Sequence, residues 1–335
     1  MARYALICGL VIFLLTGGPT PSVMAQGGQP PSVPAPTVTI HGDGPYVAVV
    51  GPALVEAFDR AMQELDAAPE LLSPTDVKNA SFRRRLLELR LLMDYGAFAY
   101  DPVLLDTFRD VVDDPYERVG SYQDVDVTQT LLQTQVRSDI VSVRLVKMNV
   151  GLATLRSPPV RQMMRDFLAA PSSSIRSLGS EETPLLWQTA QQTPSNQLDA
   201  VGNAALLGAS ALTSIHGSSP FIADVFDPVQ EAHFHDVRKG VRSILLLMNM
   251  FPETRQALIG TAEPIFALVS QYGDVNDAFI AYRMAPMLGI GTDAPATYLR
   301  REFVKAQAQQ QVVADAQSFN ALIARLSAVQ DRHQR

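Results

Sequence analysis

Four basic side chains stand within two turns of one expected helix: His235, Arg238, Lys239 and Arg242. At about 100° per residue they share about 100° of the helix circumference, and apolar side chains face the other way. The row is about 10 Å long at 1.5 Å per residue. Arginine can bind phosphate through two parallel hydrogen bonds, lysine adds a point charge, and a histidine beside a polyanion is easier to protonate. The pattern therefore indicates a surface for a row of phosphates, which binds more strongly at acidic pH.

A less regular set of basic residues occurs earlier in the chain. Arg83 and Arg90 share one face of an expected helix, with Arg84 beside them. Arg144 follows Arg137 at the same seven-residue spacing as His235 and Arg242. If the helices converge, these residues extend the phosphate surface. Further candidates lie on the last expected helix: Arg300, Arg301 and Lys305.

Two segments of the chain match in sequence and spacing. Asp124 lies 42 residues after Phe82, and Asp277 lies 43 residues after Phe234. Each aspartate closes a Gly-x-x-x-Asp sequence, and each phenylalanine opens a helix with an arginine eight residues on. This correspondence predicts a duplicated helical unit forming two pseudo-symmetric bundles. The N-terminal half covers about residues 51–170 and the C-terminal half about residues 200–330.

The duplicated motif resembles the CHAD family, the conserved histidine α-helical domain. The segment His235–Arg242 is similar to its H-x-x-R-x-x-x-R helix, and Gly273–Asp277 and Gly120–Asp124 are similar to its G-x-x-[RN]-D element. The N-terminal half departs from the pattern, with Arg83 at the histidine position and Leu86 at the first arginine. The resemblance covers about residues 51–330. It implies two helical bundles with a basic surface or channel that binds inorganic polyphosphate.

A second interpretation assigns the same arginines to a solvated face. Surface ion pairs contribute under about 1 kcal/mol each, and the chain has 34 acidic residues against 27 basic ones. In either interpretation Asp124 and Asp277 are expected to be helix caps or ion-pair partners of Arg90 and Arg242. The net charge of −7 differs from the basic domains of the family and argues against specific nucleic-acid binding. The alternative to a polyanion-binding module is therefore a structural or protein-interaction domain that has lost its ligand.

Catalytic and metal-binding motifs are not apparent. Glu231 and His235 have helical i,i+4 spacing but lack a third ligand, and the chain contains no H-E-x-x-H, G-x-S-x-G or Walker sequence. Gly289-Ile290-Gly291 follows an expected helix and is interpreted as a turn. We expect no enzymatic activity, no cofactor and no metal, and the oligomeric state is left open.

Helical periodicity and proline positions define the elements that must hold these residues. Apolar residues make up 47% of the chain, enough for a large core. We expect an all-α fold without strands after residue 50. The expected helices are 51–65, 73–97, 102–115, 116–155, 158–170, 185–191, 200–212, 220–251, 254–270, 275–287 and 294–330.

The first 50 residues differ from the rest. Arg3, an 11-residue apolar run from Ala5 to Leu15 and small residues before position 26 are typical of a secretory signal, residues 1–25. The run is too short to cross a bilayer as a helix, and Cys8, the single cysteine, lies inside it. Residues 26–50 are expected to form a Gly/Pro-rich linker with a short extended pair at 37–50. These features predict export to the periplasm or cell surface, a mature net charge of −8 and no transmembrane segment after signal removal.

Overall fold

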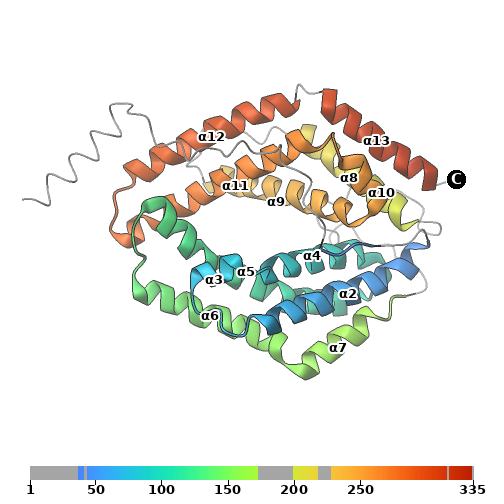
Figure 1. Cartoon of the computed structure of the whole chain (residues 1–335), viewed down its shortest axis with the longest axis horizontal. Helices are drawn as coiled ribbons and strands as arrows, with labels where there is room; N and C mark the ends of the chain where they lie inside the picture. Colours follow the sequence, from blue (N-terminus) through green and yellow to red (C-terminus); the bar gives the residue numbers. More distant parts are fainter. Residues whose placement is uncertain (1–36, 41–43, 173–198, 218–227, 315–316, 334–335) are drawn as a thin grey trace, which may run out of the picture. The chain divides into compact units, whose positions relative to one another are not determined.

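Helices form every regular element in the described part of the computed structural model, as Figure 1 shows. The structure describes residues 37–40, 44–172, 199–217, 228–314 and 317–333, all within the compact unit Val33–Arg335. The expected all-α fold is confirmed. The expected signal, most of the linker and the helix at 185–191 lie outside the described residues.

Twelve α-helices and two 3₁₀ turns make up the described elements. Their bounds are α2 Tyr46–Ala67, α3 Pro74–Asn79, α4 Phe82–Tyr95, η1 Ala97–Ala99, α5 Pro102–Leu132, α6 Ser138–Arg156, α7 Pro158–Leu168, α8 Ala200–Gly217, α9 Pro228–Met250, α10 Pro252–Leu258, α11 Glu263–Met284, η4 Pro286–Leu288, α12 Asp293–Ala314 and α13 Gln317–His333.

The start of α3 is set by a capping box at Ser73. Ser73 caps α3 by accepting a hydrogen bond from the Asp76 backbone N–H, and the Asp76 carboxylate accepts one from the Ser73 backbone in return. This reciprocal capping box satisfies two backbone donors that a helix start leaves unpaired. The helix nevertheless ends at Asn79 and a new one begins at Phe82, so the expected single helix over 73–97 is wrong.

The helix boundary expected at Pro115 is wrong. The sequence predicts separate helices over 102–115 and 116–155, but α5 continues through Pro115 to Leu132. Val112, Pro115 and Val119 are all buried, so one apolar face runs past the proline and its burial outweighs the lost backbone hydrogen bond. The helix ends where Gln133 takes a left-handed conformation, with φ +48°.

Similar differences occur near both ends of the described chain. The extended pair expected at 37–50 is wrong for residues 46–50, which begin α2. Tyr46 is buried at this helix start, with its ring edge against Tyr95. In the C-terminal half, α10 ends before Gly260, whose φ of +76° breaks the helix, and α11 continues through Gly273. The expected helix over 294–330 is divided into α12 and α13.

Four helices enclose the region where the predicted basic residues lie. The helix α4 contacts α5 and α9, and α11 contacts the same two helices. Outside this ring, α2 packs on α4, α8 packs on α9 and α12 packs along α11 (Figure 1). Each half thus supplies two helices of the ring. The pseudo-symmetry of the halves stays a prediction.

Residues 37–40 tie the start of the described chain to both halves. Val38 and Ile40 are buried, and the Ile40 backbone N–H donates to the Met250 carbonyl of α9 at 2.8 Å. Thr37 donates through its hydroxyl to Glu88 of α4. Among the described residues, none of the helices combines the length and apolarity that crossing a bilayer requires.

Candidate anion-binding cleft

A cleft of about 750 Å³ opens between α4, α5, α9 and α11. Its described lining includes eight basic residues against four acidic ones, a formal charge of +4 in a chain of net charge −7. The basic residues are Lys78, Arg83, Arg84, Arg90, Arg238, Lys239, Arg242 and Arg283, and the acidic ones are Asp94, Glu117, Asp124 and Asp277. Six of the eight ligand residues that the sequence predicts therefore meet in one place.

Arg83 is held in the cleft by groups that do not neutralise it. Its Nη1 donates to Gln123 Oε1 at 2.9 Å, and its guanidinium lies 4.9 Å from the Tyr116 ring centroid. Gly120 makes room for it, because a Cβ there would overlap the guanidinium. The Arg83 Nε atom is buried without a hydrogen bond among the described residues. Arg83 thus has neutral neighbours at contact distance among the described residues.

Three other predicted ligands already have carboxylate partners. Arg84 pairs with Glu88 at 3.3 Å, and Lys239 approaches Glu117 at 3.7 Å. Arg90 pairs with Asp113 and also lies 4.5 Å from the Tyr116 ring centroid. A ligand phosphate would have to compete with these carboxylates for the same donors.

Arg238 and Arg242 differ from the paired residues. Neither has a carboxylate within 4.0 Å among the described residues, and the Arg238 Nε atom is buried without a hydrogen bond there. Burial lowers the pKa of Arg238, and the neighbouring Arg242 charge lowers it further while Asp277 opposes the shift. Burial also lowers the pKa of Arg242, and the charge of Arg83 from the other half adds to this effect. These directions describe guanidinium groups gathered closely enough to repel one another.

Asp124 and Asp277 do not act as helix caps. Both lie inside long helices, α5 and α11. Burial raises the pKa of both carboxyl groups. The expected pairing of Asp124 with Arg90 is wrong, because Asp113 occupies that position.

The charges that act on the two aspartates come from across the cleft. Arg83 lowers the pKa of Asp124, with Arg144 and Arg283 acting in the same direction. Asp277 accepts a hydrogen bond from Asn276 and is influenced by Arg238, Lys78 and Arg83 rather than by Arg242. The aspartates therefore sit among the arginines as neighbouring charges, without an ion pair at contact distance among the described residues.

Some predicted residues lie elsewhere. Arg144 on α6 is not among the described lining residues, although it donates to the backbone carbonyl of Ser121, which is one of them, at 2.5 Å. His235 belongs to α9, but its side chain lies outside the described part. Arg301 and Lys305 on α12 both bind Glu302, and α12 contributes no residue to the described lining.

Sequence reasoning missed several lining residues. Lys78 follows the α3 cap, Arg283 lies six residues after Asp277, and Tyr116 follows an internal proline. The i,i+6 spacing from Asp277 does not place Arg283 on the face of the recognised motif, and a tyrosine in an apolar helix is usually core. The spacing of the motif therefore could not predict these three lining residues.

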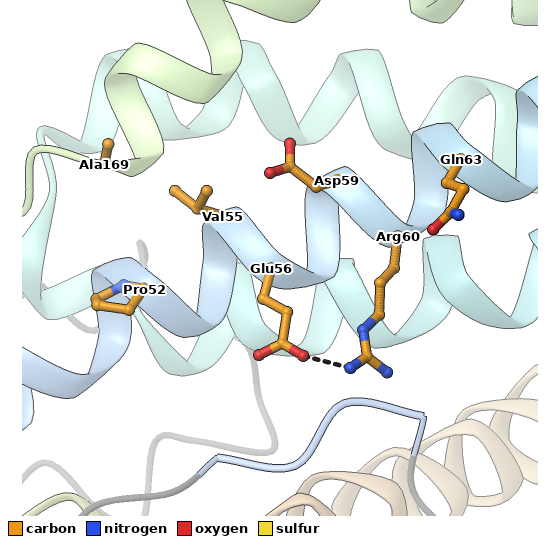
Figure 2. Close-up of a pocket in the computed structure, with 7 residues that line it drawn as sticks. All are labelled: Pro52, Val55, Glu56, Asp59, Arg60, Gln63 and Ala169. Atoms are coloured by element: carbon orange, nitrogen blue, oxygen red, sulfur yellow. Dashed lines mark hydrogen bonds and ion pairs between the residues drawn. The ribbon is translucent and has the colours of Figure 1, made fainter.

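A second depression lies along α2 and does not gather free charge. Figure 2 shows Glu56 and Arg60 paired at its rim, and Asp59 is bound by Arg165 of α7. Within the described residues there is also no cluster of three or more histidine, cysteine or acidic side chains that could hold a metal ion. The cleft between α4, α5, α9 and α11 is thus the stronger candidate site.

Searches of known protein families, curated proteins and solved structures return no match to this chain.

Proposed function

We propose that the cleft binds inorganic polyphosphate or a similar phosphate-rich polyanion, and that the protein is an exported, non-catalytic binding module. The observation that carries the proposal is the gathering of Arg83, Arg238 and Arg242, here called the arginine triad, around one cleft without carboxylate partners at contact distance in the described residues. Guanidinium groups present planar donors that match phosphate oxygens two at a time. A polyanion would supply the negative charge that the arginine triad lacks at contact distance among the described residues.

The distribution of the cations favours a polymer over a single phosphate. The triad comes from both halves of the chain, and the paired residues Arg84, Arg90 and Lys239 flank it. A chain of phosphates can contact several of these groups at once and release the counterions that each had condensed. The basic helix at 235–242 and its resemblance to the CHAD helix support the same ligand class. Export rests on the signal-like residues 1–25.

The alternative function is a structural or protein-interaction domain. The ion pairs at Arg84 and Arg90 favour it, because they are contacts of the ordinary stabilising kind. The triad opposes it, because partly buried cations without counter-charges raise the free energy of the folded protein. The two functions therefore predict opposite changes in the stability of the folded protein when a triad charge is removed.

A thermal-shift titration with long-chain polyphosphate tests the proposal. We expect polyphosphate to raise the melting temperature of the wild type at about 50 mM salt and much less at about 200 mM, as counterion release requires. The double variant Arg238→Gln/Arg242→Gln should lose most of the shift. The double variant Arg137→Gln/Arg165→Gln removes the same charge from two exposed ion pairs outside the cleft and should keep it. A wild type that shows no salt-sensitive shift would reject polyphosphate as the ligand.

A further inference from the structure

We infer that Tyr116 is a positioning residue of the cleft: its ring holds two arginines of α4, Arg83 and Arg90, in place for the ligand. The inference rests on the proposed function, because positioning matters only if the arginines bind a ligand. Tyr116 lies on α5, lines the cleft and is 7% exposed.

The ring of Tyr116 collects two guanidinium groups. Arg83 and Arg90 are seven residues apart, which places them on one face of α4 about 10 Å apart along its axis. Their guanidinium carbons nevertheless lie only 4.9 Å and 4.5 Å from the same ring centroid. Both side chains therefore reach the same ring from positions two turns apart on α4.

An aromatic residue suits this position better than an acid would. The negative face of a ring attracts a cation without carrying a formal charge, so the guanidinium remains available to an anionic ligand. A carboxylate at the same place would neutralise the group, as Asp113 does for Arg90. The ring is itself buried, on the same helix as the buried Val112 and Val119.

Two variants of Tyr116 separate the ring from the hydroxyl. Tyr116→Phe keeps the ring and should bind polyphosphate within about twofold of the wild type. Tyr116→Leu removes the ring and should weaken binding at least about tenfold. Rescue of most of the affinity by phenylalanine is the signature of positioning by the ring. Circular dichroism and thermal melting of both variants establish that the fold is kept.

A double-mutant cycle tests the assignment further. In an Arg83→Gln background, Tyr116→Leu should cost much less affinity than in the wild type, since one group that the ring positions is gone. Arg137→Gln, outside the cleft, serves as the background control and should leave the full cost of Tyr116→Leu in place.

The outcomes distinguish this inference from the proposed function. If the wild type binds polyphosphate and Tyr116→Leu binds equally well, or if its effect is additive with Arg83→Gln, the positioning role is overturned and the proposed function stands. If the wild type does not bind polyphosphate, both are overturned together. Similar binding by the wild type and Tyr116→Phe, much weaker binding by Tyr116→Leu, and a reduced effect of Tyr116→Leu in the Arg83→Gln background support both.

Discussion

Replacing Arg242 by glutamine should stabilise the ligand-free protein. The side chain is partly buried, and the formal charges that act on its pKa are those of Arg83 and Arg84, both of the same sign. Glutamine removes the charge but keeps much of the aliphatic stem and a polar end, so little packing is lost. The substitution therefore relieves repulsion without opening a large cavity.

The size of the effect follows from simple electrostatics. Two unit charges about 10 Å apart repel by about 1.7 kcal/mol at an effective dielectric constant of about 20, whereas like charges on an exposed helix surface cost about 0.2–0.5 kcal/mol. Arg242 is between these limits, so we expect a gain of about 0.5–1.5 kcal/mol in the free energy of unfolding. In a domain of this size that corresponds to a rise of about 1–4 °C in melting temperature.

Differential scanning calorimetry of the ligand-free protein at low and high salt measures this gain. The rise should shrink as salt increases, because salt screens the repulsion in the open part of the cleft. Arg137→Gln, which removes an exposed charge paired with Asp139, should change stability by less than about 0.5 kcal/mol. A fall in melting temperature for Arg242→Gln would refute the reasoning, because it would mean that Arg242 has a stabilising counter-charge and a structural role.

Three further outcomes follow from the structure. Gly120→Ala should displace the Arg83 guanidinium and weaken polyphosphate binding several-fold without loss of stability. Gly291→Ala should leave binding intact, because Gly291 is outside the cleft lining and an added Cβ there meets no atom within 4 Å. Calorimetry and titration of both variants decide this, and equal affinities would contradict it. Burial raises the Asp94 pKa to about 6, so the folded state binds the proton more tightly than the unfolded state does. As the pH falls from about 7.5 to about 5, the wild type should therefore gain stability relative to Asp94→Asn, measured by urea unfolding. A difference that stays constant with pH would contradict this. Ile40→Ala should cost about 2–5 kcal/mol because the side chain is buried, and a loss below about 1 kcal/mol would show that residues 37–40 are not part of the core.

Local chemistry made the helical architecture predictable. Ser73 and Asp76 announce a helix start through side chains that bond their own backbone, and the structure shows that capping box. Boundaries that depend on burial were not predictable in the same way. Pro115 normally ends a helix, but α5 passes through it because the apolar face on either side is continuous.

The sequence predicted most of the basic residues that line the cleft, but it did not predict which of them form ion pairs with carboxylates. Helical spacing placed the basic residues on two faces, and the packing of α4 against α9 brings those faces together. Which cations are neutralised depends on contacts between helices. Asp113 reaches Arg90 from α5, 23 positions along the chain, and no periodicity within one helix reports that contact. The same reason hid Tyr116, whose role appears once two arginines are seen on its ring.

An acidic protein can hold a basic cleft because most of its acidic residues lie outside the described lining, which includes four of them. Arg165, Arg161 and Arg137 each meet an aspartate on the exterior, and Glu302 binds two cations of α12. A helical interface selected for stability alone would pair its inner arginines in the same manner, since an unpaired partly buried cation raises the energy of the folded state. The triad departs from this rule in both halves, and the groups that hold Arg83 are an amide, an aromatic ring and a glycine. Neutral partners fix the position of a cation and preserve its charge, which is the arrangement that an anion-binding site requires.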